Sequence, residues 1–145
     1  ICFRLQVPNF LPYCQQKGLP PFHYFLYHVT KSLTEIDNFC YRLLQGEVIR
    51  IDSYTPSYTT LTSQNLFNFT KFEFTADMDE FLQRSLKAKG LVINETRLLN
   101  AGIDLTPKEL KKYFFITSIP WLDFTAIEHP IFSFKSTDIP SLAWG

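Results

Sequence analysis

The sequence predicts an α/β fold, a two-layer sandwich in which helices pack on one mixed β-sheet. The 145 residues are 46% apolar and 17% aromatic, which is enough for the core of one domain. The 15 Phe and 7 Tyr residues favour strands, because aromatic side chains fit a half-buried pleated surface. Segments in which apolar side chains recur at every second residue, as in strands, lie on both sides of two long segments with the apolar spacing of a helix. This order is typical of a sheet covered by helices. We therefore expect a single domain over residues 1–145.

The first quarter of the chain reads as one strand and one or two helices. Side chains alternate in residues 1–7, which predicts a strand ended by Pro8, and residues 9–18 predict a short helix or turn closed by Gly18. Residues 19–36 give the clearest helix, with prolines suited to its first turn. Its apolar residues recur at helical spacing and predict a stripe that faces the core. The stripe consists of Phe22, Phe25, Leu26, Val29 and Leu33.

A hairpin and two further strands are expected next. Two β-favouring runs within residues 38–54 flank Gln45 and Gly46, which predicts a tight turn between antiparallel strands. Residues 57–63 and 67–75 alternate strongly and predict two more strands. These runs supply much of the expected sheet.

A second long helix is predicted over residues 75–90. Thr75 is placed to cap its N-terminus and Gly90 its C-terminus. Further along, Thr106 and Glu109 have the spacing of a capping box at the start of a short helix. The predicted inner face of the long helix consists of Met78, Phe81, Leu82 and Leu86.

The last third is expected to be strands interrupted by a Pro-Trp step. Residues 111–119 predict a strand, and residues 122–127 and 130–134 two more. Pro120 lacks an N–H and fixes φ, so pairing must stop where it stands. Pro120 and Trp121 therefore mark the end of a strand.

Composition excludes several classes of function. Lysines and arginines number 14 and acidic residues also 14, all scattered, so no basic stripe exists to bind nucleic acid or an anionic membrane surface. Cys2, Cys14 and Cys40 form no C-x-x-C pair, which argues against a disulfide framework and against a thiolate metal site. Free thiols suit the reducing cytosol, where we expect the protein.

Chemistry-bearing residues are few. His23 and His28 are five residues apart, the wrong spacing for a shared metal face, and are read as surface or half-buried side chains. Thr117 stands near the Pro-Trp step and shares a strand face with Phe115 and Ile119. Its hydroxyl can donate into a pocket, although packing alone also explains a threonine in a strand. No catalytic motif of the common hydrolases, kinases or nucleotide-binding enzymes occurs.

Two segments resemble the chloramphenicol acetyltransferases. Residues 117–127, "TSIPWLDFTAI", are similar to the S-x-x-P-W-x-x-F-[TDS]-[SA] segment of that family. Residues 51–60, "IDSYTPSYTT", are similar to its W-D-S-[VI]-x-P-x-[FY]-T-V segment. The weaker matches elsewhere follow the family's order over essentially all 145 residues.

The resemblance implies a function and a set of site residues. It implies an acetyl-CoA-dependent O-acetyltransferase that acts on a hydroxyl of a small-molecule acceptor, without a metal. Thr117 matches the family's serine that binds the oxyanion of the tetrahedral intermediate. Phe3, Thr59 and Phe67 match positions that line the acceptor pocket, and His129 stands where that pocket has Leu, which makes it more polar.

Residues expected from the family are also missing. The signature H-H-x-x-x-D-G, which carries the general-base histidine, does not occur in these 145 residues. We expect the chain to be the N-terminal and central part of such an enzyme, and the family resemblance implies a homotrimer with the site between subunits. Two alternatives remain open, a dihydrolipoamide acyltransferase-like catalytic domain and a non-catalytic ligand-binding or oligomerisation protein of the same fold.

Overall fold

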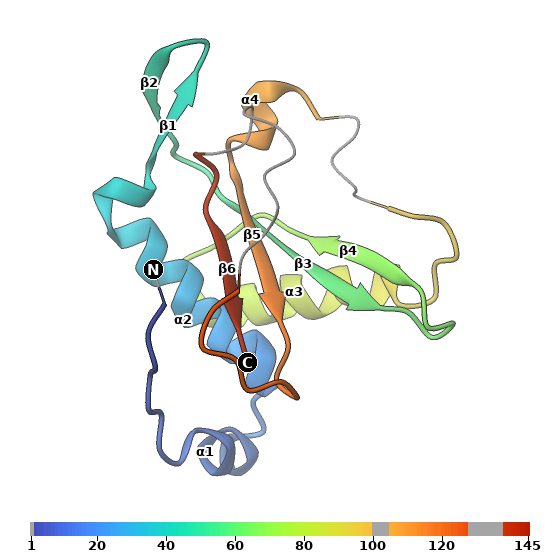
Figure 1. Ribbon diagram of the computed structural model, residues 1–145. Helices are drawn as coiled ribbons and strands as arrows, with labels where there is room; N and C mark the ends of the chain where they lie inside the picture. The colour runs from blue at the N-terminus through green and yellow to red at the C-terminus, as the bar shows by residue number, and fades with distance from the viewer. Residues whose placement is uncertain (1, 100–104, 128–137) are drawn as a thin grey trace.

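The computed structural model describes residues 2–99, 105–127 and 138–145. Two layers are visible in Figure 1, a four-stranded sheet and the helices packed behind it. The helices are α1 (Phe10–Lys17), α2 (Pro21–Glu35), α3 (Met78–Val92) and α4 (Pro107–Leu110), with a 3-10 turn at Asp37–Phe39. The strands are β1 (Tyr41–Leu44), β2 (Glu47–Arg50), β3 (Thr55–Leu61), β4 (Phe67–Lys71), β5 (Tyr113–Ser118) and β6 (Ser141–Trp144).

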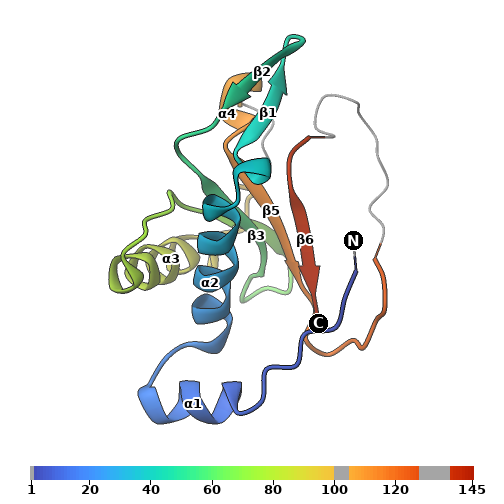
Figure 2. The same cartoon turned by 90° about the vertical axis from the view of Figure 1, so that its left-hand side faces the viewer.

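The main sheet is mixed, as predicted. Its strand order is β4-β3-β5-β6, with β3 antiparallel to β4 and parallel to β5, and β5 parallel to β6. Figure 2 shows α2 and α3 together on one side of this sheet. The predicted α/β class with helices packed on a mixed sheet is therefore confirmed.

The core lies between the helices and the sheet. Phe81 of α3 and Phe114 of β5 are fully buried, and the rings of Tyr27, Phe72 and Phe74 lie against Phe81 at 5.0–5.9 Å between centroids. Burial of a large apolar side chain stabilises the fold by roughly 1.5–3 kcal/mol. The central cluster consists of Leu26, Tyr27, Leu33, Tyr58, Phe81, Leu82, Phe114 and Ile116.

Local sequence signals are confirmed at two turns. The β1–β2 hairpin turns at Gln45 and Gly46, whose φ angles of 54° and 88° are those of a mirror-image turn that suits the twist of paired strands. The capping box is present at α4, where Thr106 accepts from the Glu109 N–H and the Glu109 side chain accepts from the Thr106 N–H. Gly18 closes α1 with a φ of 65°, also as predicted.

Two predicted strands are not formed. Residues 2–7 have no strand and are exposed, and residues 122–127 follow the end of β5 without regular secondary structure. Both segments have alternating or β-favouring side chains, but a strand needs a partner with free backbone groups, and neither segment has one among the described residues. Pairing does stop where Pro120 predicts, because β5 ends at Ser118. The predicted strand at 130–134 lies outside the described residues.

The long helix α3 differs from the prediction at both ends and on its inner face. Asp77, not Thr75, is the N-cap, and its side chain accepts from the Glu80 N–H at 2.8 Å. Gly90 lies inside the helix, which continues to Val92.

The inner face of α3 includes Ser85 in place of Leu86. Leu86 is 47% exposed, while Ser85 is fully buried. The small hydroxyl is preferred at this position because it has a buried polar partner, His23.

Candidate functional site

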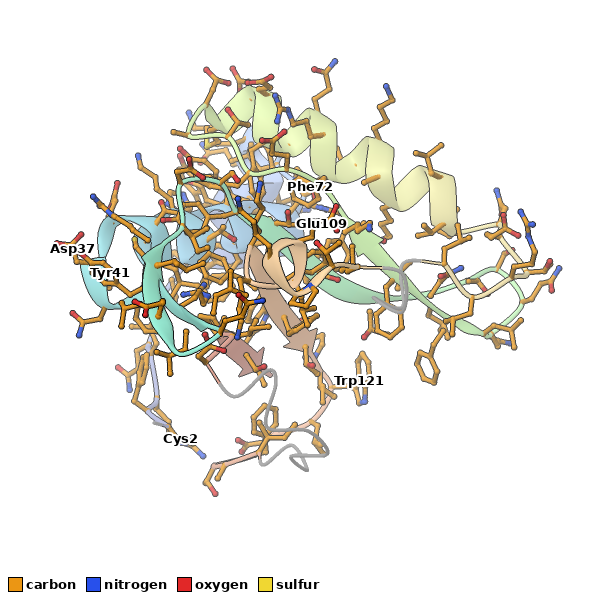
Figure 3. The ribbon with its side chains drawn as sticks, turned by 90° about the horizontal axis from the view of Figure 1, so that it is seen from above. Cys2, Asp37, Tyr41, Phe72, Glu109 and Trp121 are labelled. Carbon is orange, nitrogen blue, oxygen red and sulfur yellow. The ribbon has the colours of Figure 1, made fainter. Side chains whose placement is uncertain are left out.

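A cavity of about 230 Å³ opens on the face of the sheet that the helices leave uncovered. Figure 3 shows the labelled Trp121 on this side, opposite α3. The cavity crosses the central strands and reaches β4 and β6 at its edges. It is lined by Ser57, Tyr58, Thr59, Phe69, Phe115, Ile116, Thr117 and Ser141.

Strand alternation explains which side chains face the cavity. Ser57 and Thr59 are two residues apart on β3, as are Phe115 and Thr117 on β5, so each pair shares one face. The intervening Tyr58 and Ile116 belong to the core on the other face. Three hydroxyls and an aromatic ring are thereby placed on the open face by the period of the strands alone.

The register sets these residues in two rows across the sheet. In the first row, Ser57 pairs with Phe115, and Phe115 pairs with Ser141. In the second, Thr59 pairs with Phe69 on β4, and Thr117 lies one step beyond the last β3–β5 pair, opposite Thr59. Neighbouring strands are about 4.8 Å apart, so the two threonines flank the same small space.

The cavity lining carries no charge. None of the eight residues is acidic, basic or a histidine, and burial raises the pKa of Tyr58, its one titratable group, to about 12. Tyr58 is therefore neutral at physiological pH and provides no base. The cavity offers hydroxyl donors for a developing negative charge, while a proton acceptor must come from elsewhere.

The structure brings two of the five sequence-predicted site residues together. Thr59 and Thr117 line the cavity on adjacent strands. Phe3 is 79% exposed on the N-terminal segment and Phe67 is 70% exposed at the start of β4, and neither lines the cavity. His129 lies outside the described residues.

Sequence reasoning missed four lining side chains, namely Ser57, Phe69, Phe115 and Ser141. Parity provides a signal for Ser57 and Phe115, because each is two residues from a predicted site residue. Phe69 is two residues from Phe67 on β4 and therefore shares its face, but it lies further from the end of the strand. No local signal exists for Ser141, since its place depends on β6 pairing with β5 across 22 residues of chain.

A buried ion pair fixes the chain just before Ser141. Lys111 and Asp138 form a salt bridge, with side chains 7% and 17% exposed, and the other carboxylate oxygen of Asp138 accepts from the Leu43 N–H at 2.6 Å. Burial alone would raise the pKa of Asp138, but the hydrogen bonds from Lys111 and Leu43 outweigh it and lower the pKa. The hairpin, the start of β5 and the approach to β6 are thus held together, which positions Ser141.

Neither described histidine lines the cavity, although the ring of His23 lies 6.1 Å from that of Tyr58 on the core side of the sheet. His28 is exposed, whereas His23 is only 3% exposed, so the expectation of a surface or half-buried side chain is wrong for His23. Its Nδ1 lies 2.7 Å from the Ser85 hydroxyl of α3. Burial, and then the charge of Lys89, lowers the pKa of His23 from 6.5 to about 4. His23 is therefore a neutral core residue.

Acid should destabilise the fold through His23. Between pH 6.5 and 4 the unfolded chain binds a proton at this residue and the folded chain does not, so the stability present above pH 6.5 is lost as the pH falls. The loss is on the order of 3 kcal/mol. Urea unfolding at pH 7 and pH 5 should show about 2 kcal/mol of this loss, and His23→Gln should show a flatter pH dependence in this interval. An unchanged slope in His23→Gln would show that other groups are responsible.

Neither a cluster of metal-ligating side chains nor a helix able to span a membrane is found in the part of the chain that is described. No group of three or more His, Cys, Asp or Glu side chains there is placed to hold a metal ion. No helix in these ranges is long and apolar enough to cross a bilayer.

The fold and the cavity define an α/β protein with a neutral, hydroxyl-lined cavity on the open face of a mixed sheet. The family model for chloramphenicol acetyltransferase matches residues 1–143, and the chain belongs to that family. It is thereby an acyltransferase of the chloramphenicol acetyltransferase type.

The same relationship is found among solved structures. A chloramphenicol acetyltransferase superposes with a TM-score of 0.85 at 20% identity, over 99% of this chain and 68% of the other. At that identity the likeness supports the fold. No curated protein sequence matches the chain.

Proposed function

We propose that the protein is an acetyl-CoA-dependent O-acetyltransferase that acetylates a hydroxyl group of a small molecule. The observation that carries the proposal is the position of Thr117, a family-matched hydroxyl that lines the cavity beside Thr59. Family membership supports the reaction class. The free thiols of Cys2, Cys14 and Cys40 suit a reducing cytosol as the place of reaction.

The proposed reaction is direct transfer. A base takes the proton of the acceptor hydroxyl, whose oxygen attacks the thioester carbonyl carbon of acetyl-CoA. The carbonyl oxygen becomes an oxyanion, and the Thr117 hydroxyl donates a hydrogen bond to it. Collapse of the tetrahedral intermediate breaks the carbon–sulfur bond, and the protonated base returns its proton to the coenzyme A thiolate.

The base is proposed to be the histidine of the family's H-H-x-x-x-D-G segment in the complete protein. The printed sequence lacks this segment, and the uncharged cavity lining provides no alternative. A homotrimer in which one subunit's histidine faces the cavity of the next would supply it. The open sheet face that carries the cavity suits such an arrangement.

Phe3, Phe67 and His129 are proposed as further walls of the acceptor site. Phe3 and Phe67 are more than two-thirds exposed, so their rings are available to a neighbouring subunit that completes the acceptor site. Large exposed apolar side chains near a pocket are typical of surfaces that are covered in an assembly.

A thiol-release assay tests the proposal. The protein expressed from its complete gene should release free coenzyme A thiol from acetyl-CoA only when a hydroxyl acceptor is present, and the matched deoxy compound should give no release. Tight binding of coenzyme A with no release for any hydroxyl acceptor would contradict the proposal and favour a non-catalytic protein of this fold.

A further inference from the structure

The side chains that the sheet presents to the cavity form its floor, in the two rows described above. The first row of this floor places an aromatic ring between two hydroxyls. Ser57, Phe115 and Ser141 are partner positions on β3, β5 and β6, so the Phe115 ring is flanked by one serine on each side. The threonines of the second row lie beside them, with Phe69 at the edge of that row. The floor thus combines the apolar surface of the two phenylalanine rings with neutral serine and threonine hydroxyls beside them, which form its rim.

The hydroxyls of this floor are unused within the described residues. Those of Ser57, Thr59, Thr117 and Ser141 make no hydrogen bond there, although Ser57 is only 4% exposed. On the opposite face of the same strands, Thr60 and Thr70 bond each other at 2.6 Å. Thr59 and Ser141 are exposed and Thr117 is half-buried, so Ser57 is the informative residue. Because buried polar groups are nearly always paired, the free hydroxyl of the buried Ser57 at the cavity wall indicates a partner that enters the cavity.

Size limits what that partner is. The cavity volume of about 230 Å³ falls below the roughly 300–1,000 Å³ of sites for drug-sized ligands. It accommodates a single ring with small substituents. The C–H face of a saturated ring packs on Phe115 and Phe69, while hydroxyl substituents at its edge reach the rim.

We infer that Ser57 and Ser141 bind hydroxyl groups of the acceptor that are not acylated, and that the acceptor is a compact ring carrying several hydroxyls. The inference rests on the proposed function, because it takes Thr117 as the centre where acylation occurs. Ser57 and Ser141 determine specificity, since an acceptor without the second and third hydroxyl forms no hydrogen bond with them and leaves the buried Ser57 hydroxyl unpaired.

Two ring alcohols of matched skeleton test the inference, cyclohexanol and myo-inositol. Calorimetry with the complete protein should show myo-inositol bound at least about tenfold more tightly than cyclohexanol. In the double variant Ser57→Ala/Ser141→Ala the difference should fall below about threefold, because the partners of the extra hydroxyls are gone. The control Ser63→Ala removes an exposed serine hydroxyl from the turn between β3 and β4 and should keep the preference.

Calorimetry measures acceptor binding and thiol release measures turnover, so the inference about the acceptor and the acyltransferase proposal can fail independently. Equal binding of the two rings, binding of neither, or a preference that survives in the double variant would overturn the inference. If thiol release persists in any of these cases, the acyltransferase proposal stands. Should the double variant fail to fold, Ser141→Ala alone, at an exposed position, must lose part of the preference.

Discussion

Thr117→Val is expected to lower kcat for acetyl transfer about 10²- to 10³-fold, the effect of removing one oxyanion donor. Valine keeps the branched shape and the strand preference of threonine and removes only the hydroxyl. Thr117 is half-buried at the end of β5, and its hydroxyl makes no hydrogen bond among the described residues, so the fold should tolerate the change. Thiol release with the complete protein measures kcat.

The matched control for this variant is Thr117→Ser. Serine retains the donor and removes a methyl group, so it should keep kcat within about tenfold of the wild type. Equal activity of Thr117→Val and the wild type would show that the oxyanion is held by another group, and equal loss in both variants would indicate a packing role.

Phe81→Ala is expected to lower the free energy of unfolding by about 3–5 kcal/mol. Phe81 is fully buried at the centre of the core, and the rings of Tyr27, Phe72 and Phe74 pack on it from α2 and from the chain after β4. Truncation leaves a cavity that these elements cannot fill without losing their own contacts. The loss is a large part of the roughly 5–15 kcal/mol that holds a domain folded.

The control for this change is Leu91→Ala on the same helix. Leu91 is 71% exposed, so its truncation should change stability by no more than about 0.5 kcal/mol. Urea denaturation followed by circular dichroism compares the two. Similar midpoints for both variants would contradict the description of Phe81 as the centre of the core.

Features set by neighbouring residues were predictable from the sequence. The Gln45–Gly46 turn and the Thr106–Glu109 box each depend on backbone and side-chain geometry within four residues. The end of pairing before Pro120 follows from the missing N–H of proline. These predictions needed no knowledge of the rest of the fold.

Two predictions that depend on distant partners failed. Alternation in residues 2–7 is a real strand pattern, yet nothing in the sequence says whether a partner edge is available, and the segment is exposed and has no regular secondary structure. The inner face of α3 was misplaced by one residue, because apolar spacing favours Leu86 and the buried Ser85 is selected by His23 on another helix. Polar pairs between elements leave no periodic signal.

The candidate site was only partly predictable, because some of its residues are brought together by strands that are distant in sequence. The family-like segments point to Thr59 and Thr117, and the structure sets them on adjacent strands of one cavity. Ser141 lines the same cavity through a parallel pairing that no local pattern reveals. The hydroxyl character of the floor therefore becomes visible only when the three strands are placed side by side.

The central claim is that an acetyl group passes from acetyl-CoA to an acceptor oxygen. The most direct measurement uses acetyl-CoA labelled with ¹³C in the acetyl group, incubated with the complete protein and a hydroxyl acceptor and analysed by mass spectrometry. The account predicts the label in an ester on the acceptor, formed in proportion to the free thiol released. Label that stays on coenzyme A, or that is found only as free acetate, would contradict it.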